Sequence, residues 1–135
     1  MKKIIIEQLK KLNNIALKHG DVPVSCIIVK NNKIIAKEYN KRQKKNSPLA
    51  HAEILAIIKA AKRIKTWNLN DCELYVTLEP CEMCKSIINE ARIKKVYYIL
   101  SKTKKINDTV KYEQLDVADN DYFLNEIKEF FVNKR

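Results

Sequence analysis

Apolar residues recur every three or four positions over residues 2–18, from Ile5 to Ala16. This spacing predicts an amphipathic helix whose other face is rich in lysine. Gly20, the single glycine of the chain, follows where helices commonly end in a left-handed residue. The first predicted element is therefore a helix that ends just before Gly20.

Longer apolar runs without helical spacing predict the strands. Residues 22–30 and 34–39 are separated by a short Asn-rich turn and predict a β-hairpin. Residues 73–78 alternate β-forming side chains, and residues 96–100 form another apolar run. A short edge strand is expected within residues 111–117. The chain thus has five predicted strands.

Three further helices are expected between and after these strands. Residues 50–64 show helical spacing, with Ser47 or Pro48 marking the start, after a polar, basic loop over residues 41–49. The helix over residues 81–91 is opened by Pro80, because proline is tolerated in a first turn.

The last predicted helix is capped by Asp119 or Asn120 and carries several aromatic residues. The whole order predicts an α/β layered fold in a single domain, residues 1–135. The strands at 73–78 and 96–100 are joined by a helix, so they are expected to pair in parallel.

Charge adds a possible partner. The chain has 27 Lys and Arg residues against 16 Asp and Glu, a net charge of +11, and the excess is concentrated in residues 30–45 and 85–105. Clusters of basic residues such as these are typical of proteins that bind nucleic acids. The alternative is an AT-rich genome, because the codons of Lys, like those of Asn and Ile, are AT-rich. Both explanations remain open from charge alone.

No apolar run approaches the roughly 18 to 20 residues of a membrane span, and no signal peptide is evident, so a cytoplasmic protein without membrane contact is expected. A cytosolic chain keeps its thiols reduced. Cys26 and Cys72 are then best interpreted as buried small apolar residues, and Cys81 and Cys84 as metal ligands.

Two short motifs carry the candidate chemistry, His51-Ala52-Glu53 and Pro80-Cys81-Glu82-Met83-Cys84. One imidazole and two thiolates are three good zinc ligands, and a fourth position left to water is typical of a catalytic zinc site. Glu53 is not needed as a ligand, and a carboxylate beside such a water is what a proton shuttle requires.

The spacing of His51 and Glu53 constrains the geometry. Two residues correspond to about 200° around a helix, so both side chains reach one site only if the helix points its N-terminus at that site. A helix N-terminus is electropositive and has free N–H groups, which suits a developing anion. Cys81 and Cys84 also begin a helix, where thiol pKa values are lowered.

His-x-Glu followed by Pro-Cys-x-x-Cys is the signature of the zinc nucleobase deaminases. The chain resembles the bacterial tRNA-specific adenosine deaminases in particular, through about residue 99 and again in the last helix. The matching segments are Asp21-Val-Pro-Val, Tyr39-Asn40, Ala50-His-Ala-Glu-Ile-Leu-Ala, Leu74-Tyr-Val-Thr-Leu-Glu-Pro-Cys-Glu-Met-Cys and Glu129-Phe-Phe-Val-Asn-Lys-Arg.

The resemblance implies a cytidine-deaminase-like three-layer α/β/α fold with a mixed five-stranded sheet. It implies a hydrolase that uses one zinc ion per subunit to edit a tRNA, converting the wobble adenosine to inosine. Zinc would be held by His51, Cys81 and Cys84, with Glu53 as the catalytic proton shuttle. A homodimer that pairs along its helices is also expected.

Substrate contacts follow from the same resemblance. Asn40 is expected to hydrogen-bond the flipped base, or else to be a turn residue, and Val22 and Leu78 to line the pocket. Backbone N–H groups near Ala52 and Cys81 are expected to orient the reacting groups.

The chain departs from that family after residue 100, where an Asp-x-Lys-x-Gly pattern is usual and Lys104 alone is kept, with Lys102 in place of the Asp. Both lysines are expected to contact RNA phosphates. Two alternatives therefore stay open: a deaminase of a free base, nucleoside or nucleotide of the cytosine, guanine or dCMP type, and a non-catalytic zinc-bearing partner subunit. Retention of Glu53 argues against the second.

Overall fold

The computed structural model describes residues 2–101 and 110–133. The strands are β1 (Ser25–Lys30), β2 (Lys33–Tyr39), β3 (Cys72–Leu78), β4 (Lys95–Leu100) and β5 (Lys111–Gln114). The helices are α1 (Lys2–Lys18), α2 (Arg42–Lys45), α3 (Ala52–Ile64), α4 (Glu82–Glu90) and α5 (Asn120–Asn133).

The strands form one mixed five-stranded sheet in the order β2-β1-β3-β4-β5. β1 pairs antiparallel with β2 and β3, whereas β3, β4 and β5 run parallel. The predicted hairpin turns at Asn31 and Asn32, whose φ angles of 51° and 60° suit a tight turn that matches the twist of the strands. The parallel pairing of β3 and β4 through α4 is confirmed.

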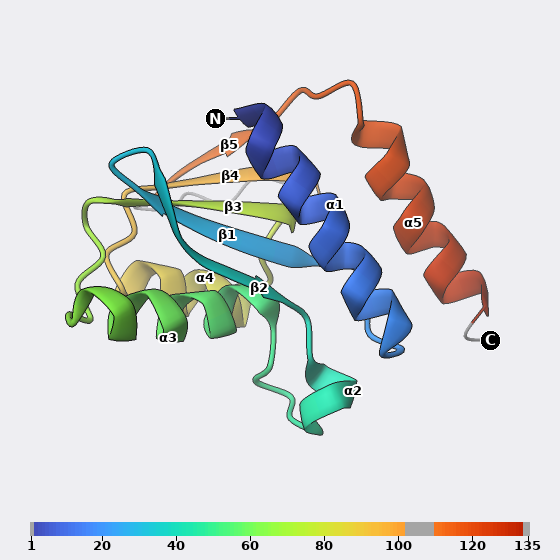
Figure 1. The fold of residues 1–135 in the computed structure, drawn as a ribbon, viewed down its shortest axis with the longest axis horizontal. Coiled ribbons are helices and arrows are strands. Elements are labelled where there is room, and N and C mark those ends of the chain that lie inside the picture. Colours follow the sequence, from blue (N-terminus) through green and yellow to red (C-terminus); the bar gives the residue numbers. More distant parts are fainter. Residues whose placement is uncertain (1, 102–109, 134–135) are drawn as a thin grey trace.

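Helices cover both faces of this sheet, as Figure 1 shows, with α3 and α4 on one side and α1 and α5 on the other. Alternating strand residues therefore feed two cores. On the α3/α4 side, Ile28 and Leu74 are buried together with Ala56, and on the α1/α5 side Ile27 packs with Phe123. The expected three-layer fold is confirmed.

The structure corrects three details of the predicted elements. The loop expected over residues 41–49 contains the short helix α2, which ends at Asn46 with a left-handed φ of 50°. The N-cap of α3 is His51, so Ser47 and Pro48 lie outside the helix. Pro80 does not stand in the first turn of α4, because the extended residue Cys81 comes between them as the N-cap.

Cys26 and Cys72 are fully buried and unpaired, as predicted. Within the described residues, no helix has both the length and the apolar character that crossing a membrane requires.

Candidate active site

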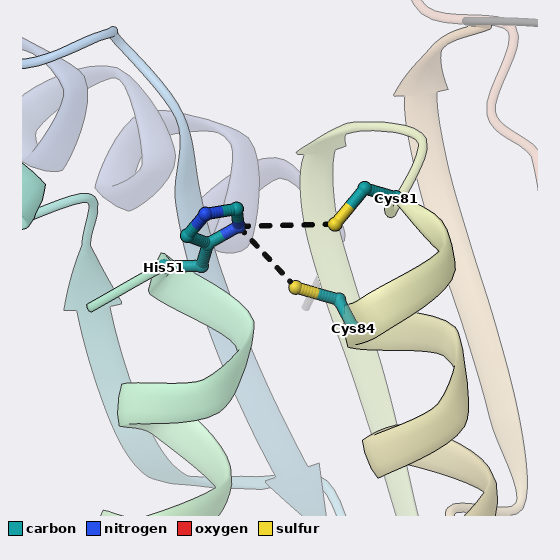
Figure 2. Close-up of side chains that lie close together, drawn as sticks. All are labelled: His51, Cys81 and Cys84. Atoms are coloured by element: carbon teal, nitrogen blue, oxygen red, sulfur yellow. Dashed lines mark hydrogen bonds between the residues drawn. The ribbon is translucent and has the colours of Figure 1, made fainter. Parts of the chain in front are cut away.

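The N-termini of α3 and α4 meet beside the edge of the sheet where β2, β3 and β4 end. His51 and Cys81 are the two N-cap residues, and both have extended backbones, with ψ angles of 148° and 170°. Neither side chain makes a capping hydrogen bond to its own helix. Both side chains, with Cys84 from the first turn of α4, turn instead toward one point between the helices, as Figure 2 shows.

The separations among these three side chains fit a tetrahedral metal ion. His51 Nδ1 lies 3.5 Å from Cys84 Sγ and 3.9 Å from Cys81 Sγ, and all three ligand atoms lie within 4.8 Å of one another. Zinc holds nitrogen at about 2.0 Å and thiolate at about 2.3 Å, which places tetrahedral ligands roughly 3.5 to 3.8 Å apart. The donor set and its spacing therefore fit zinc with Nδ1 as the histidine ligand.

The surroundings of Cys84 explain why this group needs a cation. Burial raises the pKa of the Cys84 thiol well above its ordinary value, and the nearby Glu53 and Cys81 raise that pKa further. The predicted lowering of thiol pKa by the helix N-terminus is thus outweighed at Cys84 when no metal is present. A bound dication reverses this balance, because it deprotonates a coordinating thiol.

Glu53 lies in the first turn of α3 and is buried, with 4% of its surface exposed. Its carboxylate is close enough to Cys84 to contribute a side-chain hydrogen bond to that thiol. His51 and Glu53 reach the same site because His51 stands outside the helix and the axis of α3 points at the site. This is the geometry predicted from their spacing.

A cavity of about 250 Å³ opens above these residues. It is lined by Val22, Val24, Asn40, Arg42, His51, Ala52, Glu53, Leu78, Glu79, Cys81 and Phe131. The four contacts expected at Val22, Asn40, Ala52 and Leu78 therefore all lie on this cavity. Lys102 and Lys104 lie outside the described residues.

Sequence reasoning did not assign four lining residues to the site, namely Val24, Arg42, Glu79 and Phe131. Each lies in or next to a segment that was recognised: Val24 in Asp21-Val-Pro-Val, Arg42 in the basic loop, Glu79 before Pro80-Cys81, and Phe131 in the closing segment of α5. An adjoining cavity of about 270 Å³ is also lined by Val22, Asn40, Arg42 and Phe131. The hollow above the candidate metal ligands thus continues toward α2 and the end of α5.

Asn40 is buried, and its amide has a defined orientation. Its Oδ1 accepts a hydrogen bond from the backbone N–H of Arg42 at 3.0 Å. The amide oxygen is thus engaged within the chain, and Nδ2 is the donor group of this amide. A substrate at this position would be recognised through an acceptor atom.

Asp21 fixes the segment that carries Asn40 and Arg42. It is 1% exposed, and its two carboxylate oxygens accept the backbone N–H groups of Gln43 at 2.7 Å and Lys44 at 3.3 Å. A buried carboxylate bonded to two backbone donors is a strong anchor. It joins the segment before β1 to α2 at the adjoining cavity, whose lining includes Asp21.

Glu79 is held by a buried network on the other side of the cavity. Its Oε2 lies 3.5 Å from Lys85 Nζ, and its Oε1 accepts a hydrogen bond from Ser101 Oγ at 3.3 Å. Both members of the ion pair are less than 10% exposed. The network ties α4, which carries Cys84, to the ends of β3 and β4.

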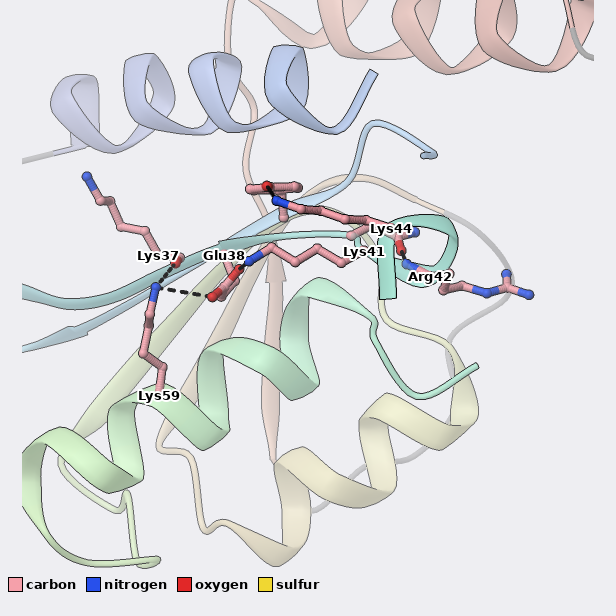
Figure 3. Close-up of polar contacts among 8 residues, drawn as sticks. Lys37, Glu38, Lys41, Arg42, Lys44 and Lys59 are labelled. Carbon is pink, nitrogen blue, oxygen red and sulfur yellow. Dashed lines mark hydrogen bonds and ion pairs between the residues drawn. The ribbon is translucent and has the colours of Figure 1, made fainter. Parts of the chain in front are cut away.

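The basic side chains of the predicted loop, residues 41–45, are more constrained than those of a loop exposed to solvent. Lys41 forms an ion pair with Glu38 at 2.9 Å, and Lys44 Nζ donates to Tyr39 Oη at 3.0 Å (Figure 3). Burial alone would raise the pKa of Glu38, but hydrogen bonds from Lys41 and Lys59 outweigh it and hold that pKa below its ordinary value. Lys41 is therefore largely neutralised within the chain.

Comparison with known proteins agrees with this geometry. Residues 2–100 match the family model of the cytidine and deoxycytidylate deaminase zinc-binding region. A tRNA-specific adenosine deaminase of Rickettsia bellii is 46% identical over 100 residues, which cover 73% of this chain and 68% of the relative. The corresponding protein of Aquifex aeolicus is 45% identical over 96 residues, covering 71% and 61%.

Solved structures point the same way. A structure from work on A-to-I editing by tRNA:A34 deaminases superposes with a TM-score of 0.77 at 26% identity, covering 84% of this chain and 98% of that one. Guanine deaminase of Bacillus subtilis superposes with a TM-score of 0.64 at 28% identity, covering 90% and 91%.

The zinc-binding region of the family and the convergent His, Cys and Cys ligands together confirm the predicted zinc cofactor. On the extent and identity of these matches, the chain belongs to the cytidine and deoxycytidylate deaminase zinc-binding family, in its tRNA-specific adenosine deaminase branch.

Proposed function

We propose that this protein is a zinc-dependent hydrolase that deaminates the wobble adenosine of a tRNA to inosine. The observation that carries the proposal is the convergence of His51, Cys81, Cys84 and buried Glu53 below one small cavity. Its 250 Å³ volume falls below the roughly 300 to 1,000 Å³ of drug-sized sites and suits a single base flipped out of its stack.

In this proposal His51, Cys81 and Cys84 hold the metal. When zinc is bound, its Lewis acidity allows water to ionise near neutral pH. In this proposal Glu53 takes one proton from the water and delivers it to the ring nitrogen of adenine as the water oxygen bonds to C6. Glu53 then passes the remaining hydroxyl proton to the amino group, so that the C6–N bond breaks, ammonia leaves and C6 becomes the carbonyl of inosine. Burial beside Cys84 keeps the Glu53 carboxylate at the reacting groups and away from bulk solvent.

The cavity walls hold the base. Val22 and Leu78 supply apolar surface on two sides, and the Nδ2 group of Asn40 donates to a base acceptor. Ala52 is the first residue of α3. The backbone N–H groups in the first turn of any helix have no acceptor within that helix, and the N–H of Ala52 is one of them. It is placed to orient a polar group at the reacting carbon.

The proposal extends to the assembly and the location of the protein. We propose a homodimer that pairs through the α3/α4 side, so that loops of one subunit border the site of the other. Residues 1–135 form one deaminase domain in this proposal, because both cores share the same sheet. Acting on a tRNA, the enzyme is proposed to work in the cytoplasm.

A free-base deaminase is the second candidate, favoured by the superposition with guanine deaminase. The two are separated by incubating purified protein with total tRNA, and in parallel with guanine, cytosine, adenosine and dCMP. Inosine at the wobble position, read by sequencing, supports the tRNA substrate. Turnover of a free base with unchanged tRNA would overturn it, and absence of any turnover by zinc-loaded protein would favour a non-catalytic subunit.

A further inference from the structure

A second cavity, of about 560 Å³, runs along the β2 edge of the sheet. We call it the β2–α3 groove, and it is lined by Gln8 of α1, Ile34, Ile35, Ala36 and Lys37 of β2, and Lys59 and Arg63 of α3. Among the described residues, none of these also lines the active-site cavity. The groove combines an apolar floor with three cations.

The cations are held in place by the edge strand. Lys59 Nζ donates to Lys37 O at 3.2 Å, and Arg63 donates to Ile35 O at 3.4 Å. Lys37 Nζ donates to Gln8 Oε1 at 3.3 Å. A guanidinium has five N–H donors and an ammonium has three, so these contacts leave donors on each group. Side chains already fixed lose less entropy when a ligand binds.

The groove keeps a positive excess after its internal ion pairs are counted. Glu38 pairs with Lys59 at 3.1 Å and with Lys41 at 2.9 Å, so one carboxylate serves two cations. Lys37 and Arg63 form no ion pair with a described acidic residue. An anionic ligand is therefore the complementary occupant.

Basic side chains lead from the groove toward the active-site cavity. Figure 3 shows the labelled cations in a row from Lys37 and Lys59, through Lys41, to Arg42. Arg42 lines the active-site cavity, and β2 leads from the groove to Asn40. The four residue steps from Ala36 to Asn40 span about 13 Å at the rise of a strand. That distance corresponds to about four nucleotides of a stacked strand, at roughly 3.4 Å each.

We propose that the β2–α3 groove binds backbone phosphates of the tRNA strand that flanks the reacting nucleotide. The proposal rests on the proposed tRNA substrate. Arg63 offers the planar pair of donors that suits a phosphate, and Lys37 adds a second charge. Such contacts give affinity and salt dependence without reading bases, so they strengthen binding of any correctly shaped stem-loop.

The competing explanation is protection of an edge strand. Cations from α3 cover carbonyl groups of β2, and such covering prevents pairing with another chain. Edge protection predicts no effect of the groove on RNA affinity. The two explanations are thus separated by binding measurements.

The test compares Lys37→Ala, Arg63→Ala and their combination with the control Lys94→Ala. Lys94 is an exposed lysine just before β4 and lies outside the groove. Binding of a tRNA anticodon stem-loop is titrated with salt. Each lost phosphate contact should lower the slope of log K against log salt by about 0.7 to 0.9, and weaken binding roughly sixfold at 0.1 M salt. Lys94→Ala should match wild type.

A three-nucleotide RNA centred on the substrate is the second arm, because it is too short to reach the groove. Wild type and the groove variants should deaminate it equally. The groove proposal would be overturned by an unchanged salt slope in the double variant, or by an equal loss of activity on the short RNA. If Arg63→Ala does not fold, Lys37→Ala alone still tests the groove proposal. Wild type that neither binds nor deaminates the stem-loop would instead overturn the tRNA substrate itself.

Discussion

Glu53 is the residue whose role separates an enzyme from a zinc-bearing scaffold. Glu53→Gln keeps the size and burial of the side chain but removes its ability to take and return a proton. We expect the variant to fold and to hold zinc, with the deamination rate lowered by about 10²- to 10⁴-fold. Metal analysis and an inosine assay on the same sample measure both quantities. Turnover close to wild type would show that another group moves the proton.

Cys84 tests the metal site with a matched control in the same core. Cys84 and Cys26 are both fully buried thiols, but Cys84 alone belongs to the described ligand group. Cys84→Ala should lose zinc and activity together, whereas Cys26→Ala should keep one zinc per chain. Atomic absorption on protein purified without chelator measures this. Full zinc occupancy in Cys84→Ala would contradict the assignment of that ligand.

The residues with a distinctive spacing were predictable from sequence, and the residues assembled by distant loops were not. His51, Glu53, Cys81 and Cys84 lie in two short motifs, so their types and positions identify their chemistry. The cavity position of Phe131 depends on how α5 crosses the molecule. No local pattern in the last helix records that crossing.

At the scale of elements, the pattern of apolar, polar and turn residues predicted all five strands and four of the five helices that the described residues form. The missed helix, α2, is four residues long and has no buried face. Hydrophobic spacing cannot report such an element, because its position depends on tertiary contacts. Helix starts were also displaced, since the N-caps His51 and Cys81 direct their side chains to the metal site instead of to their helices.

Asp21 is the tertiary contact that positions α2, and its loss should act on substrate binding. Asp21→Ala leaves the N–H groups of Gln43 and Lys44 without their acceptor and frees the segment that carries Asn40. We expect kcat/KM for tRNA to fall about tenfold, mainly through KM, with zinc content unchanged.

Asp21→Asn keeps one acceptor oxygen and serves as the conservative control. It should recover part of the lost kcat/KM in the same assay. Identical kcat/KM for wild type and Asp21→Ala would remove Asp21 from the positioning of the cavity wall.

The contact between α1 and α5 should make stability depend on pH. Asn13 Nδ2 donates to Glu126 Oε1 at 2.8 Å, and Asn13 Oδ1 is buried with no hydrogen-bond partner among the residues that the structure describes. Burial raises the pKa of Glu126, the hydrogen bond from Asn13 lowers it, and Glu129 raises it further, with a net rise. A carboxyl group whose pKa is higher in the folded than in the unfolded protein destabilises the fold when it ionises. The protein therefore loses stability as pH rises through the folded-state pKa of Glu126.

Glu126→Gln removes this ionisation and gives Asn13 Oδ1 an amide donor. We expect the free energy of unfolding at neutral pH, measured by thermal unfolding, to be about 1 kcal/mol higher in the variant than in wild type. The advantage should shrink as pH falls below the Glu126 pKa, where wild type is protonated as well. A constant difference across the acidic range would show that ionisation of Glu126 is not its cause.

At the scale of the whole molecule, the sheet order places the starts of α3 and α4 beside the end of the sheet where β2, β3 and β4 finish, and the candidate site lies at that end. The mouth of the cavity and the approach along β2 lie at the same end. The resemblance implied this arrangement, but hydrophobic pattern alone predicted layers without their relative placement. Pairing with a second copy is expected from the resemblance alone, because an exposed apolar residue can face either a partner or solvent and the hydrophobic pattern does not distinguish the two.

The last prediction concerns that pairing. Ile58 on α3 is 48% exposed, and Leu49 and Trp67, which lie just before and after α3, are 57% and 64% exposed. A two-fold interface uses the same patch on both subunits, so one added charge enters it twice. Ile58→Asp should therefore convert the proposed dimer to monomer at micromolar concentration, as measured by light scattering.

The matched control is Ile4→Asp on α1, which is 57% exposed on the opposite side of the sheet. It makes the same chemical change away from the α3/α4 side and should leave a dimer. Because loops of one subunit are proposed to border the other's site, monomeric Ile58→Asp should also lose tRNA deamination while retaining zinc. A wild-type protein that is monomeric and fully active would contradict the dimer, and a dimer lost in Ile4→Asp alone would move the interface to α1.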